Sequence, residues 1–303
     1  WGPAHEIGHI HQLAIDWPSS TESSNNLFSN FILYKLGEYC SRGTELNLPK
    51  AADNRTTNSE GNITGMTLSE AHCVLNRPWC NFGSNYQGEH TELHMRMNWQ
   101  LWNYYHRCGH KTDFWQRLFK LMRENRTSSN NPGVKQHLFA RMASEAAQED
   151  LTEFFEMWGF FVTVDTQIDQ YGSYQYTVTK EMIENAKKAM AKYPKKAKPF
   201  YYLEDRKKGD IGLDTTPPDV GHYTQFQRIR PITKDIKGNI NGREVSITNG
   251  DEAVAFELRE KDANGKLLYF STFIKFEVPL TVSLTYAKLY AVQADGKRIL
   301  LEE

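Results

Sequence analysis

Two histidines stand four residues apart at the start of the sequence, and a glutamate directly follows the first of them, in the stretch His5-Glu6-Ile7-Gly8-His9. If this stretch is helical, His9 lies about 40° round the axis from His5 and one turn along, because each residue of an α-helix turns the chain by about 100°. Both imidazoles can then reach one metal ion, with the Glu6 carboxylate beside them but not a ligand. This spacing predicts a hydrolytic site in which Zn²⁺ binds His5 and His9, and Glu6 is the general base for a zinc-bound water.

A catalytic zinc site of this kind needs a third protein ligand. The stretch Trp17-Pro18-Ser19-Ser20 ends the first predicted helix and starts a second, which carries Glu22 and Glu38. These two glutamates lie about 160° apart on a helix, so only one can face the metal, and Glu22 is the better candidate because it is nearer the turn. Ser19-Ser20-Thr21-Glu22 also fits a capping box, in which Glu22 would instead bind the Ser19 backbone. Local sequence leaves both interpretations of Glu22 open.

The sequence gives weaker evidence that other polar residues contribute to the site. Gln12 returns to the face of His5 and either orients a ligand or substrate or lies in solvent. His11 points away from His9 and is expected either to be packed or to support a metal ligand without binding the metal. His90 and His94 have the same ligand spacing but no evident third ligand. Together with Tyr86 they are a hypothesis for stabilising charge on the reacting carbonyl, against ordinary positions on a helix surface.

The composition excludes some classes of partner. The chain has 36 basic and 37 acidic residues among 303, a formal net charge of −1, so no global field attracts nucleic acid or an anionic membrane. No apolar run reaches the roughly 18 residues that a transmembrane helix requires. We therefore expect no nucleic-acid partner and no transmembrane segment, and the composition indicates no particular oligomeric state.

Hydrophobic periodicity divides the chain into two regions. The helical period of 3.6 residues predicts helices over about 4–15, from the hydroxyls of Ser19-Ser20 to about 39, and over 66–75, 89–107, 112–124, 134–146, 150–158 and 180–192, the last capped by Thr179. The period becomes two after about residue 222, and turn signals at Asn264-Gly265 and Asp295-Gly296 predict hairpins. The expected fold is α+β, with a mainly helical domain over 1–200, a charged linker over 201–221 and a small antiparallel β-sandwich over 222–303.

Two longer stretches resemble a known family. Residues 1–12, WGPAHEIGHIHQ, and residues 21–29, TESSNNLFS, are similar to the enhancin-like mucinase family of gluzincin zinc metallopeptidases. Residues 143–147 and 150–160 are similar to the closing helices of that family. The resemblance covers about residues 1–195, and the β-rich remainder is a weaker match to the C-terminal modules of bacterial members.

The resemblance implies a bacterial, secreted or cell-surface zinc endopeptidase of glycoproteins, particularly mucin-type chains with their O-glycans. By motif position, His5, His9 and Glu22 would be the zinc ligands and Glu6 the catalytic base. It further implies a thermolysin-like lobed catalytic domain, whose substrate-aligning sheet precedes the zinc helix and is missing from these residues.

Two other functions remain alternatives. A general zinc peptidase would use the same chemistry on unglycosylated proteins. A catalytically silent surface module would bind glycans or proteins through the C-terminal region and keep the metal only as a structural element. The intact Glu6 argues against the silent module, because a structural zinc site is usually closed by four protein ligands and has no use for a base.

Overall fold

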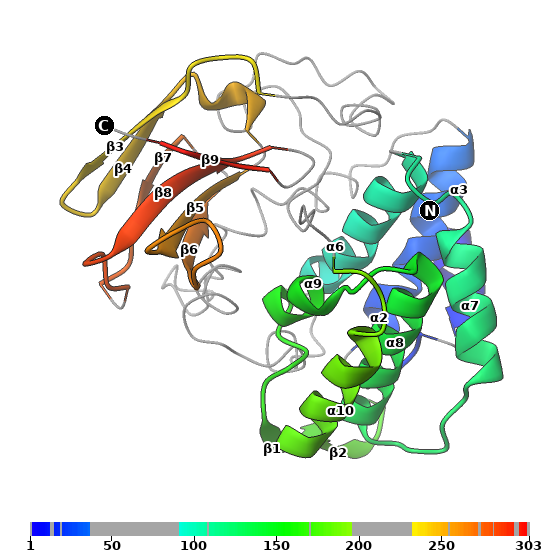
Figure 1. Ribbon diagram of the computed structural model, residues 1–303. Coiled ribbons are helices and arrows are strands. Elements are labelled where there is room, and N and C mark those ends of the chain that lie inside the picture. The colour runs from blue at the N-terminus through cyan, green and yellow to red at the C-terminus, as the bar shows by residue number, and fades with distance from the viewer. Residues whose placement is uncertain are drawn as a thin grey trace, which may run out of the picture. The chain divides into compact units, whose positions relative to one another are not determined.

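The computed structural model divides the chain into two compact units. It describes residues 2–12, 15–18, 20–36, 91–107, 109–169, 171–195, 232–253, 255–271, 274–280, 282–293 and 297–301. We call the described residues up to 195 the helical unit and those from 232 onward the β unit (Figure 1). The predicted helix at 66–75 and the predicted linker at 201–221 lie outside the described residues.

Helices and one hairpin make up the described helical unit. Its elements are α1 (Gly2–His11), α2 (Thr21–Ser24), α3 (Asn26–Leu36), α6 (Thr91–Trp102), the π-helix η4 (Asn103–Arg107), α7 (Phe114–Glu124), α8 (Pro132–Ala147), α9 (Thr152–Met157), β1 (Val164–Asp169), β2 (Ser173–Val178) and α10 (Lys180–Met190). The bounds of the four helices from α7 to α10 agree with the bounds predicted from periodicity to within about two residues at each end. The predicted first helix is also present, but it ends at His11 rather than near residue 15.

Local capping signals explain why several of these helices start where they do. The Thr179 side chain accepts a hydrogen bond from the Met182 backbone N–H at 3.2 Å, which confirms the predicted cap of α10. At α8 the Asn131 side chain accepts from the Gly133 N–H at 2.9 Å, and Pro132 occupies the first helical position. The packed pair α8 and α10 therefore begins at residues that satisfy the free N–H groups of a helix start (Figure 1).

The prediction of one continuous second helix was wrong. The helix is split into α2 and α3 at Asn25, whose side chain is fully buried. The backbone there packs closely on α1, because a Cβ added at Gly8 would lie only 2.7 Å from the Asn25 carbonyl oxygen. The split leaves Glu22 on its own short helix, while Glu38 lies outside the described residues.

The hairpin β1–β2 was not predicted from the sequence. Its two strands pair antiparallel from Val164 opposite Val178 to Asp169 opposite Ser173. Most of its side chains are half-buried or exposed, so the alternation of apolar residues is weak. The hairpin is fixed to the start of α8, where the Asn131 amide donates to the Thr177 carbonyl oxygen at 2.9 Å.

An aromatic core holds the segment between α1 and α2. The Trp17 ring is 2% exposed and lies 5.5 Å from the Phe139 ring of α8 and 6.4 Å from the Phe160 ring. Burial of a large aromatic ring here contributes roughly 2 to 3 kcal/mol. The turn that joins the two helices of the candidate site is thereby anchored in the core.

The β unit has two antiparallel sheets that share one apolar core. One sheet has the order β3 (Lys237–Asn241), β4 (Glu244–Thr248), β7 (Lys275–Glu277); the other has the order β6 (Leu267–Ser271), β5 (Ala255–Glu260), β8 (Ala287–Val292), β9 (Arg298–Leu300), and the 3-10 turn η7 spans Gly250–Glu252. Both sheets contribute side chains to the core cluster, among them Val245 and Ile247 of β4 and Phe256 and Leu258 of β5.

The predicted hairpin pairings of the β unit are confirmed. Asn264-Gly265 connects β5 to β6, and only glycine fits at Gly265 because a Cβ there would lie 1.7 Å from the Glu260 carbonyl oxygen. Strands β8 and β9 pair antiparallel as expected, although the turn residues Asp295 and Gly296 lie outside the described residues.

Candidate metal centre

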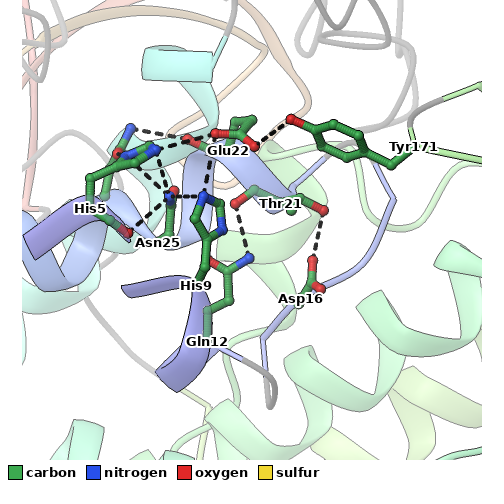
Figure 2. A network of polar contacts seen from close by, with 9 residues as sticks. His5, His9, Gln12, Asp16, Thr21, Glu22, Asn25 and Tyr171 are labelled. Carbon is green, nitrogen blue, oxygen red and sulfur yellow. Dashed lines mark hydrogen bonds and ion pairs between the residues drawn. The ribbon is translucent and has the colours of Figure 1, made fainter. Parts of the chain in front are cut away.

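Three side chains from α1 and α2 converge on one point. The Oε2 atom of Glu22 lies 3.3 Å from Nε2 of His5 and 3.7 Å from Nε2 of His9, and the two imidazole rings are 5.0 Å apart (Figure 2). One ligand atom from each residue lies within 4.8 Å of the other two. Donor atoms about 2.0 to 2.2 Å from a tetrahedral metal lie roughly 3.3 to 3.6 Å from one another, so the three side chains fit around a single ion.

The site is partly open to solvent. The exposed fractions of the side chains are 17% for His5, 30% for His9 and 27% for Glu22. Glu6 follows His5 on α1 and is exposed. A metal held by these three groups would therefore keep a position that a water or a substrate atom can reach, which is the arrangement of catalytic rather than structural zinc sites.

Close packing between α1 and α2 sets the distance between the ligand candidates. Gly8 costs roughly 1 kcal/mol of helix propensity relative to alanine, but any side chain there would collide with the Asn25 backbone. Gln12 is buried, and its amide donates to the Thr21 carbonyl oxygen at 3.0 Å. The Thr21 hydroxyl in turn donates to Asp16 at 2.8 Å. Gln12 therefore holds the start of α2, and of its two alternatives the position in solvent was wrong.

Asn26 determines which nitrogen of His5 faces Glu22. The Nδ2 atom of Asn26 donates to the Glu22 carbonyl oxygen at 3.1 Å, and because a carbonyl only accepts, this contact fixes the orientation of the amide. The Oδ1 atom then lies 2.6 Å from Nδ1 of His5 and must accept a proton from it. The lone pair of His5 is thus on Nε2, the atom that faces Glu22.

The Asn25 amide lies against both imidazole rings. Its Nδ2 atom lies 3.0 Å from Nε2 of His5 and 3.0 Å from Nε2 of His9 (Figure 2). Its own Oδ1 atom is buried and has no hydrogen-bond partner among the residues that the structure describes. The same Nδ2 atom lies 3.1 Å from Nδ1 of His5, so Asn25 contacts the His5 ring as a whole and not the Nε2 atom alone.

Tyr171 reaches the site from the hairpin β1–β2. Its hydroxyl donates to Oε1 of Glu22 at 2.8 Å, across 149 residues of sequence (Figure 2). Sequence reasoning missed Tyr171, Asn25 and Asn26, because no spacing rule links the hairpin to α2 and because both asparagines were read as part of a continuous helix. The only local signal was the Tyr171-Gly172 pair, which is typical of a turn.

The remaining sequence candidates do not join this group. The ring of His11 lies 6.0 Å from that of Phe28, although the residue itself is exposed. Tyr86 and His90 lie outside the described residues, and His94 lies in α6 without a described side chain. Those three stay a hypothesis.

No helix among the described residues combines the length and apolarity needed to cross a bilayer.

Comparison with known proteins confirms the resemblance stated above. The profile of the family described as Peptidase M60, enhancin and enhancin-like matches residues 1–159, and that of the Peptidase M60 C-terminal domain matches residues 235–300. A TRPM8 channel-associated factor homolog of Xenopus laevis is 27% identical over 173 residues, which is 53% of this chain and 15% of that protein.

Two solved structures are similar over nearly the whole chain. A metallopeptidase from Bacteroides thetaiotaomicron is 55% identical with a TM-score of 0.82, covering 99% of this chain and 49% of that one. A metallopeptidase in complex with Tn antigen is 55% identical with a TM-score of 0.80, covering 99% of this chain and 54% of that one. This chain thus spans about half the length of either structure and has the same mixture of helices and antiparallel sheets. Since the first profile covers more than half of the 303 residues, the chain belongs to the Peptidase M60, enhancin and enhancin-like family.

Proposed function

We propose that this chain carries the metal-binding part of a zinc-dependent endopeptidase that hydrolyses peptide bonds in glycoproteins, particularly mucin-type O-glycosylated chains, outside the bacterial cell. The observation that carries the proposal is the convergence of His5, His9 and Glu22 beside an exposed Glu6. Membership of a peptidase family and the similarity to two metallopeptidases support the reaction class.

The donor set favours zinc as the metal. Two imidazole nitrogens and one carboxylate oxygen are the ligands of several catalytic zinc sites, and a half-exposed site leaves a fourth position open. When bound, zinc would act as a Lewis acid that polarises the scissile carbonyl and makes water easier to deprotonate at neutral pH.

The side chains around the site have separate roles in metal binding and proton transfer. His5 and His9 would hold the ion through Nε2 and Glu22 would hold it through Oε2, while Asn26 keeps the Nε2 lone pair of His5 turned toward Glu22. Glu6 accepts a proton from the attacking water and then gives it to the nitrogen of the leaving amine. Proton transfer of this kind accounts for roughly 10² to 10⁴ in rate.

The substrate class rests on similarity and on the open site. A 55% identical structure is of a metallopeptidase in complex with Tn antigen, so a closely related chain accommodates an O-linked glycan. We propose that glycan-bearing peptides are the substrates of this protein as well.

The experiment compares two peptides of one sequence, with and without Tn antigen, digested by the full-length protein and analysed by mass spectrometry. We expect cleavage of the glycosylated peptide only. The Glu6→Gln variant should retain zinc, measured by elemental analysis, and lose roughly 10² to 10⁴ in rate. The matched control Glu184→Gln changes an exposed glutamate of α10 and should behave as the parent.

Other outcomes would change the assignment. Equal cleavage of both peptides would favour a general zinc peptidase. Cleavage of neither peptide by a zinc-loaded protein would favour a binding module. Loss of zinc from Glu6→Gln with the fold intact would mean that Glu6 is a ligand rather than the base.

A further inference from the structure

The two oxygens of the Glu22 carboxylate have different neighbours. Oε2 faces the Nε2 atoms of His5 and His9 at 3.3 and 3.7 Å. Oε1 accepts the hydroxyl hydrogen of Tyr171 at 2.8 Å. Figure 2 shows the tyrosine on the side of Glu22 away from the imidazoles. The carboxylate is therefore already divided into an oxygen that faces the histidines and an oxygen that is held by a donor.

The backbone at Tyr171 is strained. Its φ of +52° lies in the left-handed region, which is unfavourable for a residue with a side chain. Glycine would adopt this conformation freely, and the next residue is in fact Gly172 with φ +149°. A residue with φ > 0 is common in the short loop of a hairpin, so the turn accounts for this conformation, and it directs the Tyr171 hydroxyl to Glu22.

The strands below this tip hold the tyrosine in place. Strands β1 and β2 pair along their full length. The Asn131 amide, at the start of α8, donates to the Thr177 carbonyl oxygen of β2. Gly133 of α8 also lies close to β2, because a Cβ there would lie 2.5 Å from the same carbonyl oxygen. The hydroxyl is therefore supplied from the short loop of a hairpin whose strands are paired and anchored to α8.

We propose that Tyr171 is a positioning residue of the metal site: it holds Oε1 so that Glu22 binds the ion through Oε2 alone. A carboxylate without such a donor can rotate and bind through both oxygens, which would fill the position that a water or substrate needs. The inference rests on the proposed function, because it assumes that His5, His9 and Glu22 hold a metal.

A surface hydrogen bond with no link to the metal is the competing explanation, since the Tyr171 residue is 66% exposed. That explanation predicts a small change in hairpin stability and none at the metal. Cobalt(II) distinguishes the two, because its visible absorption is stronger in four-coordinate than in five-coordinate sites. A change from one-oxygen to two-oxygen ligation would therefore weaken the absorption.

The experiment uses the full-length protein with Tyr171→Phe and the matched control Tyr174→Phe, which removes a hydroxyl from the same hairpin. Zinc affinity is measured by competition with a chelator, and the cobalt-substituted proteins are compared by visible absorption. We expect Tyr171→Phe to bind zinc about 10- to 100-fold more weakly and to show the weaker cobalt absorption. Tyr174→Phe should match the parent in both measurements.

A second variant separates the contact from the backbone strain. Tyr171→Gly relieves the left-handed strain and also removes the hydroxyl, so the hairpin should become no less stable while zinc binding falls as far as in Tyr171→Phe.

Unchanged zinc affinity and an unchanged cobalt spectrum in Tyr171→Phe would overturn the positioning role and leave the proposed function standing. Failure of the parent protein itself to bind zinc would overturn both.

Discussion

Glu22 in the helical unit and Glu257 in the β unit each lie at the centre of a polar cluster, but their neighbours and their exposure differ. Glu22 is 27% exposed and faces two imidazoles and a phenol hydroxyl. Glu257 is fully buried and lies between the guanidinium groups of Arg259 and Arg298, with its Oε2 atom 2.6 Å from Nε of Arg298. The Arg259 guanidinium also donates to the Gly265 carbonyl oxygen at 2.9 Å.

The difference separates a closed cluster from an open one. Burial alone would raise the pKa of Glu257, but Arg259 and Arg298 outweigh it and hold that pKa below its usual value. Its charge is neutralised within the protein and is not accessible to a ligand. One ligand atom each of His5, His9 and Glu22 lies within 4.8 Å of the others at a partly exposed place, which is the property that a metal site needs. Four predictions test this distinction.

Replacement of a proposed ligand should have the largest effect on metal binding. His9→Ala removes one of the donor atoms and should weaken zinc binding by more than about 100-fold, beyond the 10- to 100-fold typical of residues that only orient a ligand. Chelator competition measures the affinity. Hydrogen exchange of the β unit should be unchanged, and parent-like zinc binding by His9→Ala would refute the site.

Loss of the charge at Glu257 should affect stability instead. Glu257→Gln leaves two buried guanidinium groups without their carboxylate and should destabilise the β unit by about 3 to 5 kcal/mol. Hydrogen exchange of the backbone amides in β5 and β8, followed by mass spectrometry, reports the change. The control Glu277→Gln, on an exposed position of β7, should stay within about 0.5 kcal/mol. Equal exchange in both variants would show that the buried cluster is not structural.

Asn26 offers a smaller test on the helical side. Asn26→Ala removes the acceptor for Nδ1 of His5, frees the imidazole to adopt the other tautomer, and should weaken zinc binding about 10- to 100-fold. Asn26→Asp retains an acceptor oxygen and should recover part of the affinity. Equal zinc binding by the alanine and aspartate variants would show that Asn26 does not set the tautomer of His5.

The smallest effect is a difference in acid sensitivity between the units. Burial lowers the pKa of His137 in α8, although its contact with the Phe160 carbonyl oxygen opposes the shift. The unfolded chain therefore binds the extra proton first, and the stability of the helical unit falls as the pH drops below about 6.5. The pKa of Glu257 is lower in the folded protein than the ordinary glutamate value of 4.5, so its charge stabilises the β unit above that pH. This stabilisation is lost only as the pH falls below 4.5 and through the pKa of the folded state.

Hydrogen exchange corrected for its intrinsic pH dependence should show α8 losing protection between pH 7 and 5 while β5 does not. His137→Gln should remove the response of α8. Loss of protection in both units over the same pH range would contradict the assignment.

Much of the fold was predictable from local pattern. Periodicity found α1 and the helices from α7 to α10, and the turn pair Asn264-Gly265 located a hairpin. Periodicity failed where burial depended on a distant partner. It gave one helix where contact with Gly8 divides the chain at Asn25, and it missed β1–β2, whose side chains alternate only weakly.

The sequence by itself determined which residues are candidates for the chemistry, because His5, Glu6 and His9 are placed by the geometry of a single helix. It left Glu22 open between a cap and a ligand. Only the tertiary structure decided that Glu22 faces both imidazoles, and only it brought Asn26 and Tyr171 to the site. The physical reason is that helix periodicity is a local property, whereas the orientation of a carboxylate depends on donors that the packing of α2, α3 and the hairpin β1–β2 brings within hydrogen-bond distance.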